Sequence, residues 1–469
     1  MASDPRPSFA TPSHRATPAP PDRERLQRLM AGELARFTAE HPGSRALHQR
    51  AMNSLVSGVP MPWMARWPGG YPIYVQEARG ARITDVDGRN YVDLCLGDTG
   101  AMTGHSPAAV VWAVQSQIER GVTTMLPSVD SIVVAEELTR RFGVSRWQFT
   151  LSATDANRAA LRIARQITGR HKILVFSYSY HGTVDETFAV RAEDGSTRSR
   201  AGNVGPAVNP AVTTCAIEFN NLAQLEQALA DHELACVLAE PAMTNMGIVL
   251  PDAGYHAALR TLTRRHGTLL IIDETHTFSA GPGGCTQAWG LAPDLLTIGK
   301  ALGGGIPCGA LGMSPQVVER LSEQHDADYE DTGGVGGTLA GNALAAAAMR
   351  ATLEQVLTPQ AFERMSALAS RLREGIERLI RTEQLPWNVT QLGCRVEYSF
   401  LPVAARDGTS AHAAADRELE SYLHLYLLNR GVLITPFHNM VLISPATTAA
   451  DIEQHEQYFA AAVAELFAR

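Results

Sequence analysis

One lysine stands where a surface charge is not expected. Lys300 follows the apolar run Leu295–Ile298 and precedes the glycine cluster Gly303–Gly305. Lysine is among the residues least often buried, so a lysine in this setting needs a partner or a covalent function. A Schiff base with an aldehyde cofactor is one such function, because it uses a lysine amine as the reactive group. Other groups in the chain would then have to hold that cofactor.

An acidic pair ends a second apolar run. Thr268–Ile272 is typical of a buried strand, and Asp273 and Glu274 follow it directly. A carboxylate at the end of a buried strand is costly unless it meets a cation. A protonated pyridine nitrogen would be such a cation, and an aspartate partner makes that ring an electron sink. A helix N-cap or a buried salt bridge explains Asp273 equally well when the motif is taken alone.

Small hydroxyl-bearing residues open two expected helices. Ser152, Ala153 and Thr154 follow a strand ending at Thr150, and Thr338 lies in a glycine-rich stretch before a long helix. The first turn of a helix presents free backbone N–H groups and a positive dipole end, which together bind phosphate. Plain N-capping, or a tight turn in the case of Thr338, remains an alternative.

Two further strands end in candidate site residues, an aromatic in one case and an acid in the other. Tyr180 and His181 follow Lys172–Phe176, and Glu240 follows Ala235–Ala239. An aromatic side chain at a strand end can stack on a cofactor ring. Tyr180 packed in an ordinary core is an equally good interpretation of this motif alone.

These residues require a scaffold that brings strand ends together. Helices alternate with short apolar strands from about residue 130 to residue 313, which indicates a mostly parallel sheet covered on both faces. Ligands of such sheets bind at the carboxyl ends of the strands, where the candidate residues fall. The expected strands are Trp147–Thr150, Lys172–Phe176, Ala235–Ala239, Thr268–Ile272, Leu295–Ile298 and Cys308–Met313.

The flanking segments predict a second, α+β unit. Apolar spacing favours a helix over Asp22–Glu40, and an Asp-Gly turn within Ala81–Asp93 predicts a hairpin. Beyond Gly337 we expect helices at Asn342–Val356, Pro359–Ile380, Ala413–Arg430 and Ala449–Phe467, and strands at Val389–Phe400 and Val432–Ser444. The predicted division is a disordered tail (1–21), an N-terminal segment shared by the small domain and an active-site loop (22–79), a large domain (80–345) and a small domain (346–469).

Composition excludes several classes of function. The 469 residues carry a net charge of −8, which argues against nucleic-acid binding as the main function. No apolar run approaches the roughly 18 residues of a membrane span. The six cysteines are scattered without metal-ligand spacing, which is typical of reduced thiols in a cytoplasmic protein.

Taken together, these motifs resemble the class III aminotransferases, which are pyridoxal-phosphate enzymes of fold type I. The resemblance runs from about Gly58 to the C-terminus. It is most similar to the group of glutamate semialdehyde aminomutase and the β-amino-acid aminotransferases, judged from Gly337–Asn342 and Tyr180–Gly182. The resemblance implies an α/β fold with a large, mostly parallel seven-stranded sheet, a smaller α+β domain and a homodimer.

The resemblance also implies roles for individual residues. Lys300 would form the Schiff base with pyridoxal 5′-phosphate, and Asp273 would pair with the pyridine nitrogen. The remaining cofactor contacts would come from Ser152, Ala153, Thr154, Tyr180, His181, Glu240 and Thr275, with Thr338 reaching the phosphate in the partner subunit.

Several positions depart from the family pattern. Ala153 replaces a glycine at the phosphate turn, Asp155 replaces a glutamate, and Thr275-His276-Thr277 stands where the family usually continues with valine. A solvent-facing or structural role is the simpler expectation for His276. The stretches where related enzymes carry a carboxylate-binding arginine hold none here. Trp63, Met64, Phe437 and His438 instead favour an apolar or aromatic substrate pocket, with Arg395 as a candidate for a polar contact.

The main functional expectation is a transaminase. Lys300 would act as general base and then general acid while an amino group passes from an amine, or from a β- or hydroxylated amino acid, to a keto acid. An aminomutase or racemase on the same cofactor is the first alternative, and it would need no external keto acid. A non-catalytic α/β protein that binds a phosphate ligand is the second.

Overall fold

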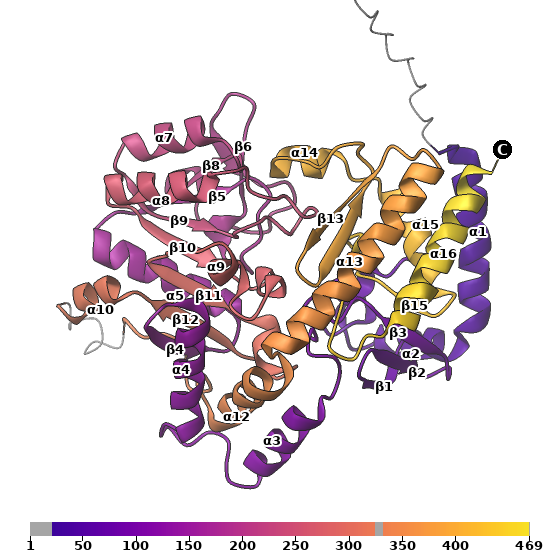
Figure 1. Ribbon diagram of the computed structural model, residues 1–469, viewed down its shortest axis with the longest axis horizontal. Helices are drawn as coiled ribbons and strands as arrows, with labels where there is room; N and C mark the ends of the chain where they lie inside the picture. The colour runs from indigo at the N-terminus through magenta and orange to yellow at the C-terminus, as the bar shows by residue number, and fades with distance from the viewer. Residues whose placement is uncertain (1–20, 324–331, 469) are drawn as a thin grey trace, which may run out of the picture.

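The structure is a computed structural model that describes residues 21–323 and 332–468. Of the tail predicted at 1–21, residues 1–20 lie outside the described residues. Figure 1 shows a sheet with helices on both of its faces at the left and a helix-rich unit containing both ends of the described chain at the right.

A seven-stranded sheet forms the centre of the larger unit. Its order is β4 (Arg146–Thr150), β12 (Gly309–Met313), β11 (Leu295–Ile298), β10 (Leu269–Asp273), β9 (Leu234–Ala239), β5 (Lys172–Phe176) and β8 (Thr214–Ile217). Only β12 runs antiparallel to its neighbours, so the expected mostly parallel sheet is confirmed. All six strands marked in the sequence are present, whereas β8, whose four residues begin with the polar Thr214, gave too short an apolar run to be recognised.

Helices bury both faces of this sheet. On one face α5 (Ala153–Thr168) packs through residues spaced three or four apart, among them Ala156, Ala160 and Ile163, as an amphipathic helix must. On the other face α7 (Leu222–Ala230) and α8 (Tyr255–His266) cover Leu174 and Leu270. The strand ends are therefore the part of the sheet left accessible to a ligand.

The second unit combines two small sheets with long helices. The sheets have the orders β1 (Val75–Arg79), β2 (Arg82–Asp85), β3 (Asn90–Asp93), β15 (Val432–Leu433), and β13 (Asn388–Leu392), β14 (Arg395–Ser399), β16 (Met440–Leu442). The helices are α1 (Arg23–Glu40), α2 (Pro42–Ala51), α13 (Pro359–Thr382), α14 (Gly408–Ala413), α15 (Arg417–Leu428) and α16 (Ala449–Phe467). The predicted hairpin and the helices over α1, α13 and α16 are confirmed.

Three expected elements are corrected. Val389–Phe400 is not one strand, because the chain reverses between β13 and β14 at Gly393, which has a φ of +59° that favours glycine. Val432–Ser444 contributes two short strands to different sheets. The helix expected at Ala413–Arg430 begins only at Arg417, because Asp416 caps it by accepting a hydrogen bond from the backbone N–H of Leu419.

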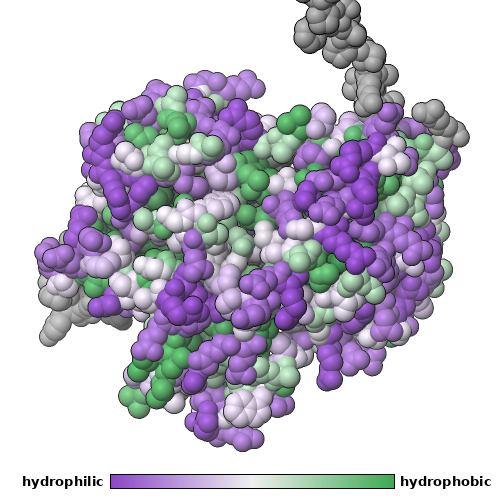
Figure 2. Space-filling model, in the orientation of Figure 1, coloured by the Kyte–Doolittle hydropathy of each residue, from purple (hydrophilic) through white to green (hydrophobic). Residues whose placement is uncertain are grey.

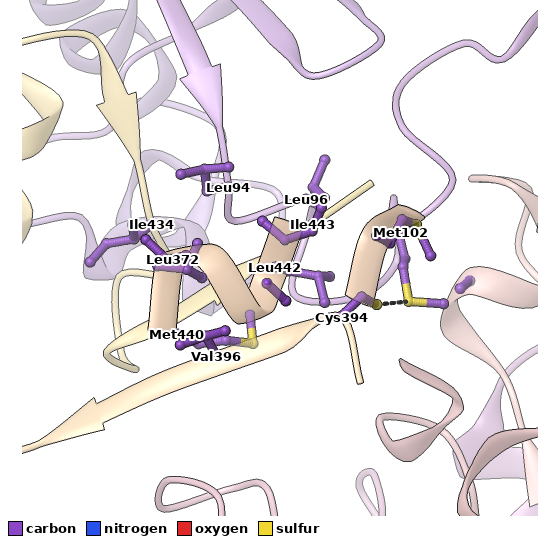
Figure 3. Packing of buried hydrophobic residues seen from close by; sticks show 14 of the residues in the cluster. Leu94, Leu96, Met102, Leu372, Cys394, Val396, Ile434, Met440, Leu442 and Ile443 are labelled. Carbon is purple, nitrogen blue, oxygen red and sulfur yellow. Dashed lines mark hydrogen bonds between the residues drawn. The ribbon is translucent and has the colours of Figure 1, made fainter. Parts of the chain in front are cut away.

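One apolar cluster contains buried residues of both units. Figure 3 shows Leu94, Leu96 and Met102, from the segment after β3, beside Leu442 and Ile443 at the end of β16. Met102 contacts the Cys394 thiol, with 3.7 Å between the sulfur atoms. The loop that follows β3 and the start of β14 are thus held by the same core.

The remaining longer helices lie between β3 and β14 in sequence. They are α3 (Ala108–Ile118), α4 (Val129–Phe142), α9 (Gly284–Ala288), α10 (Pro315–Ser322) and α12 (Ala343–Ala351).

Candidate active site

A cavity of about 480 Å³ opens at the carboxyl ends of the central strands. It brings together residues that the sequence places after five different strands, which is where a parallel sheet binds ligands. Ten of the predicted site residues line it: Trp63, Ser152, Ala153, Thr154, Tyr180, His181, Glu240, Asp273, Thr275 and Lys300.

The last residue of β10, Asp273, is buried and accepts three hydrogen bonds. His181 Nδ1 and Asn157 Nδ2 donate to its Oδ2 at 2.9 Å and 2.8 Å, and the backbone N–H of Thr275 donates to Oδ1 at 3.0 Å. Burial by itself would raise the pKa of Asp273, but the hydrogen bonds from His181, Thr275 and Asn157 outweigh it and hold the pKa below its ordinary value. The site therefore keeps a carboxylate at the floor of the cavity.

The amine of Lys300 lies between an acid and an imidazole. Lys300 occupies a left-handed conformation, with a φ of +46°, immediately after β11. Its Nζ is 2.7 Å from Asp98 Oδ2 and 2.7 Å from His276 Nε2. A non-glycine residue in this conformation carries strain that persists where the surrounding structure fixes it, which is common at functional sites.

The start of α5 closes one side of the cavity. Ser152 caps the helix, since its Oγ accepts from the backbone N–H of Asp155 at 3.3 Å. Two glycines allow the segments after β5 and β11 to lie close against this helix start. A Cβ on Gly299 would lie 2.9 Å from the backbone nitrogen of Ala153, and one on Gly182, whose φ is +80°, would collide with the Thr154 hydroxyl. The N-capping alternative for Ser152 is thus observed, and the helix start also faces the cavity.

Three buried polar atoms of the cavity lining lack a hydrogen-bond partner among the described residues: His181 Nε2, Glu240 Oε1 and Thr275 Oγ1. Buried polar atoms are normally satisfied, so a polar ligand that reaches them is favoured. Burial raises the pKa of Glu240 to about 7, although nearby His181 and the hydroxyl of Thr244 oppose the rise. Together with the buried carboxylate of Asp273, these atoms fit a planar, polar cofactor.

Aromatic side chains surround the entrance. Trp63, in a short helical turn over Pro62–Arg66, has its ring 5.5 Å from Tyr180 and 5.6 Å from Phe437. Arg66 lies over the Phe437 ring at 5.4 Å. Of the predicted pocket residues, Met64 is 43% exposed and, like Phe437, does not line the cavity.

The buried Arg395 lies behind the cavity wall. It begins β14 and donates from Nη2 to the carbonyl of Thr244 at 3.0 Å and from Nη1 to His276 Nδ1 at 3.1 Å. Glu397 Oε2 is 3.5 Å from it, and Glu397 Oε1 is also 3.4 Å from His438 Nδ1. Arg395 and His438 are therefore one layer further from the cavity than the sequence suggested.

Thr338 lies apart from the cavity. It is exposed, and it lines a separate surface groove with Met125 and Leu126. Within one chain it is therefore not brought to the residues that surround Lys300.

Sequence reasoning missed three residues at the centre of the site. Asp98 and Asn157 received no role, and His276 was expected to face solvent or to be structural, whereas it lines the cavity beside Lys300. Asn157 follows the helix start by one turn, so helical spacing could have placed it on the sheet side. Nothing in the sequence shows that the loop holding Asp98 folds over Lys300.

The fold and these residues define a pyridoxal-phosphate-dependent enzyme of fold type I. The sequence profile described as Aminotransferase class-III matches residues 63–463. The chain belongs to the class-III aminotransferase family.

Several proteins that are similar to this chain are aminomutases. A glutamate-1-semialdehyde 2,1-aminomutase from Anaeromyxobacter sp. (strain Fw109-5) is 32% identical over 427 residues, covering 90% of this chain and 98% of that protein. The structure of a glutamate-1-semialdehyde-aminomutase from Pseudomonas aeruginosa PAO1 is 48% identical with a TM-score of 0.93, covering 95% of this chain and 100% of that chain. A variant of such an aminomutase from the same organism is in complex with PMP.

A transaminase shares the fold at lower identity. The β-phenylalanine aminotransferase from Variovorax paradoxus is 26% identical with a TM-score of 0.81, covering 93% of this chain and 97% of that chain. The similarity to aminomutases therefore supports the isomerase alternative better than the transaminase that was the main expectation. Among the described residues, no helix is long and apolar enough to cross a membrane.

Proposed function

We propose that this chain is a pyridoxal-phosphate-dependent aminomutase, which exchanges an amino group and a carbonyl oxygen between neighbouring carbons of one substrate molecule. The observation that carries the proposal is the 48% identity to a glutamate-1-semialdehyde-aminomutase over the whole of that chain. The substrate class is an α-amino aldehyde, and the product is the isomeric amino ketone. No atom is gained or lost, so no second substrate is required.

The residues around the cavity have distinct parts in this proposal. Asp273 would hold the cofactor ring protonated, and Tyr180 would contact the ring. Ser152, Ala153 and Thr154 would bind the phosphate at the start of α5. When bound, the cofactor supplies an electron sink for the carbon that loses a proton. Lys300 Nζ takes that proton and returns it to the neighbouring position.

The polar atoms left unpaired in the cavity orient the cofactor. Glu240 and Thr275 offer a carboxyl oxygen and a hydroxyl at its edge, and His181 fixes Asp273 through Nδ1. The aromatic residues at the entrance, Trp63 and Phe437, exclude water from the reacting carbons. Excluding water strengthens the electrostatic interactions inside the site.

The active form in this proposal is a homodimer. Exposed apolar residues gather on and between α3 and α4, and Figure 2 shows hydrophobic surface at the lower left, where α4 begins. Thr338 lies in the groove beside this surface, and in this proposal it contacts the phosphate bound in a second subunit. The exposed apolar residues are Val111, Trp112, Ile118, Met125, Leu126, Val129 and Ile132. The proposed domains remain 80–345 for cofactor binding, except that strands β2 and β3 join the small domain through β15, and 346–469, with part of 22–79, for the small domain.

Transamination is the second candidate. The aromatic entrance formed by Trp63, Tyr180 and Phe437 favours it, because such an entrance suits a bulky amine donor. The β-phenylalanine aminotransferase of the same fold gives this candidate a precedent. Both reactions use the same lysine and aspartate, so the need for a keto acid separates them.

The proposal is tested by turnover without a co-substrate. The purified holoenzyme is incubated with an α-amino aldehyde such as glutamate 1-semialdehyde, with and without pyruvate, and the amino ketone is quantified. We expect many turnovers in both cases. A transaminase would instead form no amino ketone; it would release about one equivalent of the dicarbonyl compound per subunit and turn over further, with formation of alanine, only after pyruvate is added.

A further inference from the structure

Two arginines to which the proposed reaction gives no role lie near the entrance of the cavity. Arg66 ends a short helical turn, and its guanidinium carbon is 5.4 Å from the centre of the Phe437 ring. Arg200 follows β7 (Thr197–Ser199) and is half-buried, with its guanidinium carbon 5.3 Å from the centre of the Tyr178 ring. Two distant parts of the chain thus each bring a cation to an aromatic ring in this region.

Tyr180 links both arginines to the cavity. It lines the cavity, and the carbonyl of the preceding residue, Ser179, accepts a hydrogen bond from Arg200 Nη1 at 3.4 Å. Burial raises the pKa of Tyr180, and Asp98 adds to the rise. Arg200 and Arg66 oppose it, so both guanidiniums act on the same hydroxyl. The two positive charges therefore lie beside one residue of the cavity wall.

Neither charge is balanced by an acidic side chain. In the part of the chain that the structure describes, no carboxylate forms an ion pair with Arg66 or Arg200. Burial lowers the pKa of Arg200, and the charge of Arg66 adds to this effect, whereas Tyr178 and Tyr180 oppose it. A guanidinium that is partly removed from water and faces a second one is stabilised by a nearby anion.

Arg395, the arginine expected from the sequence to contact substrate, is less suited to a ligand anion. Its Nη2 and Nη1 atoms donate to the Thr244 carbonyl and to His276. Glu397 lies 3.5 Å from it and balances its charge. The two entrance arginines have no such set of partners, so their donors remain available to a ligand.

The backbone beside Arg200 is held in place. Tyr178 has a φ of +65°, an uncommon conformation for a residue other than glycine, and Asn245 Nδ2 donates to its carbonyl at 2.9 Å. The backbone N–H of Arg200 donates to the carbonyl of Phe188 at 2.8 Å. Because these segments are already ordered, less conformational freedom is lost when a ligand binds between them and the cavity.

We propose that Arg66 and Arg200 form a binding site for a carboxylate at the end of the substrate chain remote from the reacting carbons. The planar fork of a guanidinium matches the two oxygens of a carboxylate, which favours this group over an uncharged one. The inference deepens the proposed function and rests on it for the reacting end of the substrate. The substrate is then an α-amino aldehyde whose chain ends in a carboxylate, and the rings of Trp63 and Tyr180 contact the carbons between the two ends.

The test is a binding measurement that needs no turnover. Isothermal titration calorimetry of the holoenzyme compares valerate with valeramide, in which an amide of similar shape replaces the carboxylate. Neither probe has an amine that reacts with the cofactor. Each is titrated into wild type, Arg66→Gln and Arg200→Gln. Arg198→Gln, at an exposed arginine of β7, is the control.

We expect wild type and Arg198→Gln to bind valerate about tenfold more tightly than valeramide, or better. Arg66→Gln and Arg200→Gln should each lose about tenfold in affinity for valerate, the effect of losing one charge-assisted hydrogen bond, and keep their affinity for valeramide. Equal affinity of wild type for the two probes would overturn the inference, as would an unchanged affinity for valerate in either arginine variant. The binding result does not depend on formation of the amino ketone, so this inference and the aminomutase proposal can fail separately.

Discussion

At the residue scale, the buried carboxylate of Asp273 is the group on which cofactor chemistry depends most. Three hydrogen bonds hold it ionised without placing a lysine or arginine against it, so a ligand cation has access to it. Asp273→Asn keeps the shape and removes the charge. We expect cofactor to remain bound and turnover to fall by roughly 100-fold or more, the usual cost of removing one preorganised electrostatic partner.

The measurement for Asp273→Asn is a steady-state rate beside a cofactor titration. Asp231→Asn, at an exposed acid that follows α7, is the control and should keep the wild-type rate. A rate within a few-fold of wild type in Asp273→Asn would contradict the role given to this carboxylate.

Glu240 gives a prediction about stability and pH. Burial raises its pKa to about 7, above the ordinary value of 4.5. Between these two values the folded state holds a proton that the unfolded state has lost, so stability falls as pH rises through this interval. Glu240→Gln carries no titrating group and should escape this fall, which is on the order of 3 kcal/mol for a shift of this size.

Urea unfolding of the cofactor-free protein at pH 5 and pH 8 measures this effect. The free-energy difference between Glu240→Gln and wild type should be larger at pH 8 than at pH 5. The same difference at both values would show that Glu240 stays ionised in the fold.

Residue types predicted the site residues at the strand ends better than those supplied by loops. Lys300, Asp273 and Tyr180 follow strands, and strand order alone brings them together. Asp98 approaches Lys300 through a loop with uncommon φ values, and that path depends on packing between distant segments. His276 looked like a surface histidine because the sequence does not show Arg395 behind it.

At the scale of elements, the turn before α5 forms the side of the cavity that we propose binds the phosphate. Gly182, with a φ of +80°, lies so close to Thr154 that an added Cβ would overlap the hydroxyl. Gly88, with the same φ of +80°, faces open space at the turn between β2 and β3. The two alanine substitutions therefore carry the same backbone strain but differ in the contact.

Gly182→Ala should weaken cofactor binding by about tenfold or more, because it displaces the start of α5. Gly88→Ala should lower stability by about 1 kcal/mol and leave cofactor affinity unchanged. Cofactor titration and thermal unfolding separate the two effects. Equal affinity in both variants would show that this turn does not hold the cofactor.

Elements with a clear period were predictable, and elements set by tertiary contacts were not. The strands β5 and β10, which are apolar runs, and the amphipathic helix α13 could be predicted directly from the sequence. The reversal between β13 and β14 depends on a left-handed glycine inside an otherwise strand-like stretch, and the division of β15 from β16 depends on which sheet each strand joins.

At the scale of the whole molecule, the apolar surface near α4 bears on assembly. Leu126 is 75% exposed within it, and Val403 is 73% exposed elsewhere. Leu126→Glu should favour monomers and reduce turnover, because a buried unpaired charge destabilises an interface and the partner's phosphate contact is lost. Val403→Glu is the matched control and should sediment and react like wild type. A Leu126→Glu protein that stays dimeric would place the interface elsewhere.

The fold as a whole was predictable because the order of strands and helices leaves few arrangements open. The reaction was not, because a transaminase and an aminomutase use the same lysine, the same aspartate and the same scaffold. The similarity to aminomutases was needed to favour one of them.

The central claim is that Lys300 serves a reaction that moves an amino group within one molecule. The most direct measurement is product formation by the holoenzyme from an α-amino aldehyde in the absence of any keto acid, with Lys300→Ala as the comparison. The account predicts many turnovers per subunit for wild type and a loss of turnover in Lys300→Ala. The absence of amino ketone, with about one equivalent of a dicarbonyl product per subunit and further turnover to alanine only when pyruvate is added, would contradict it.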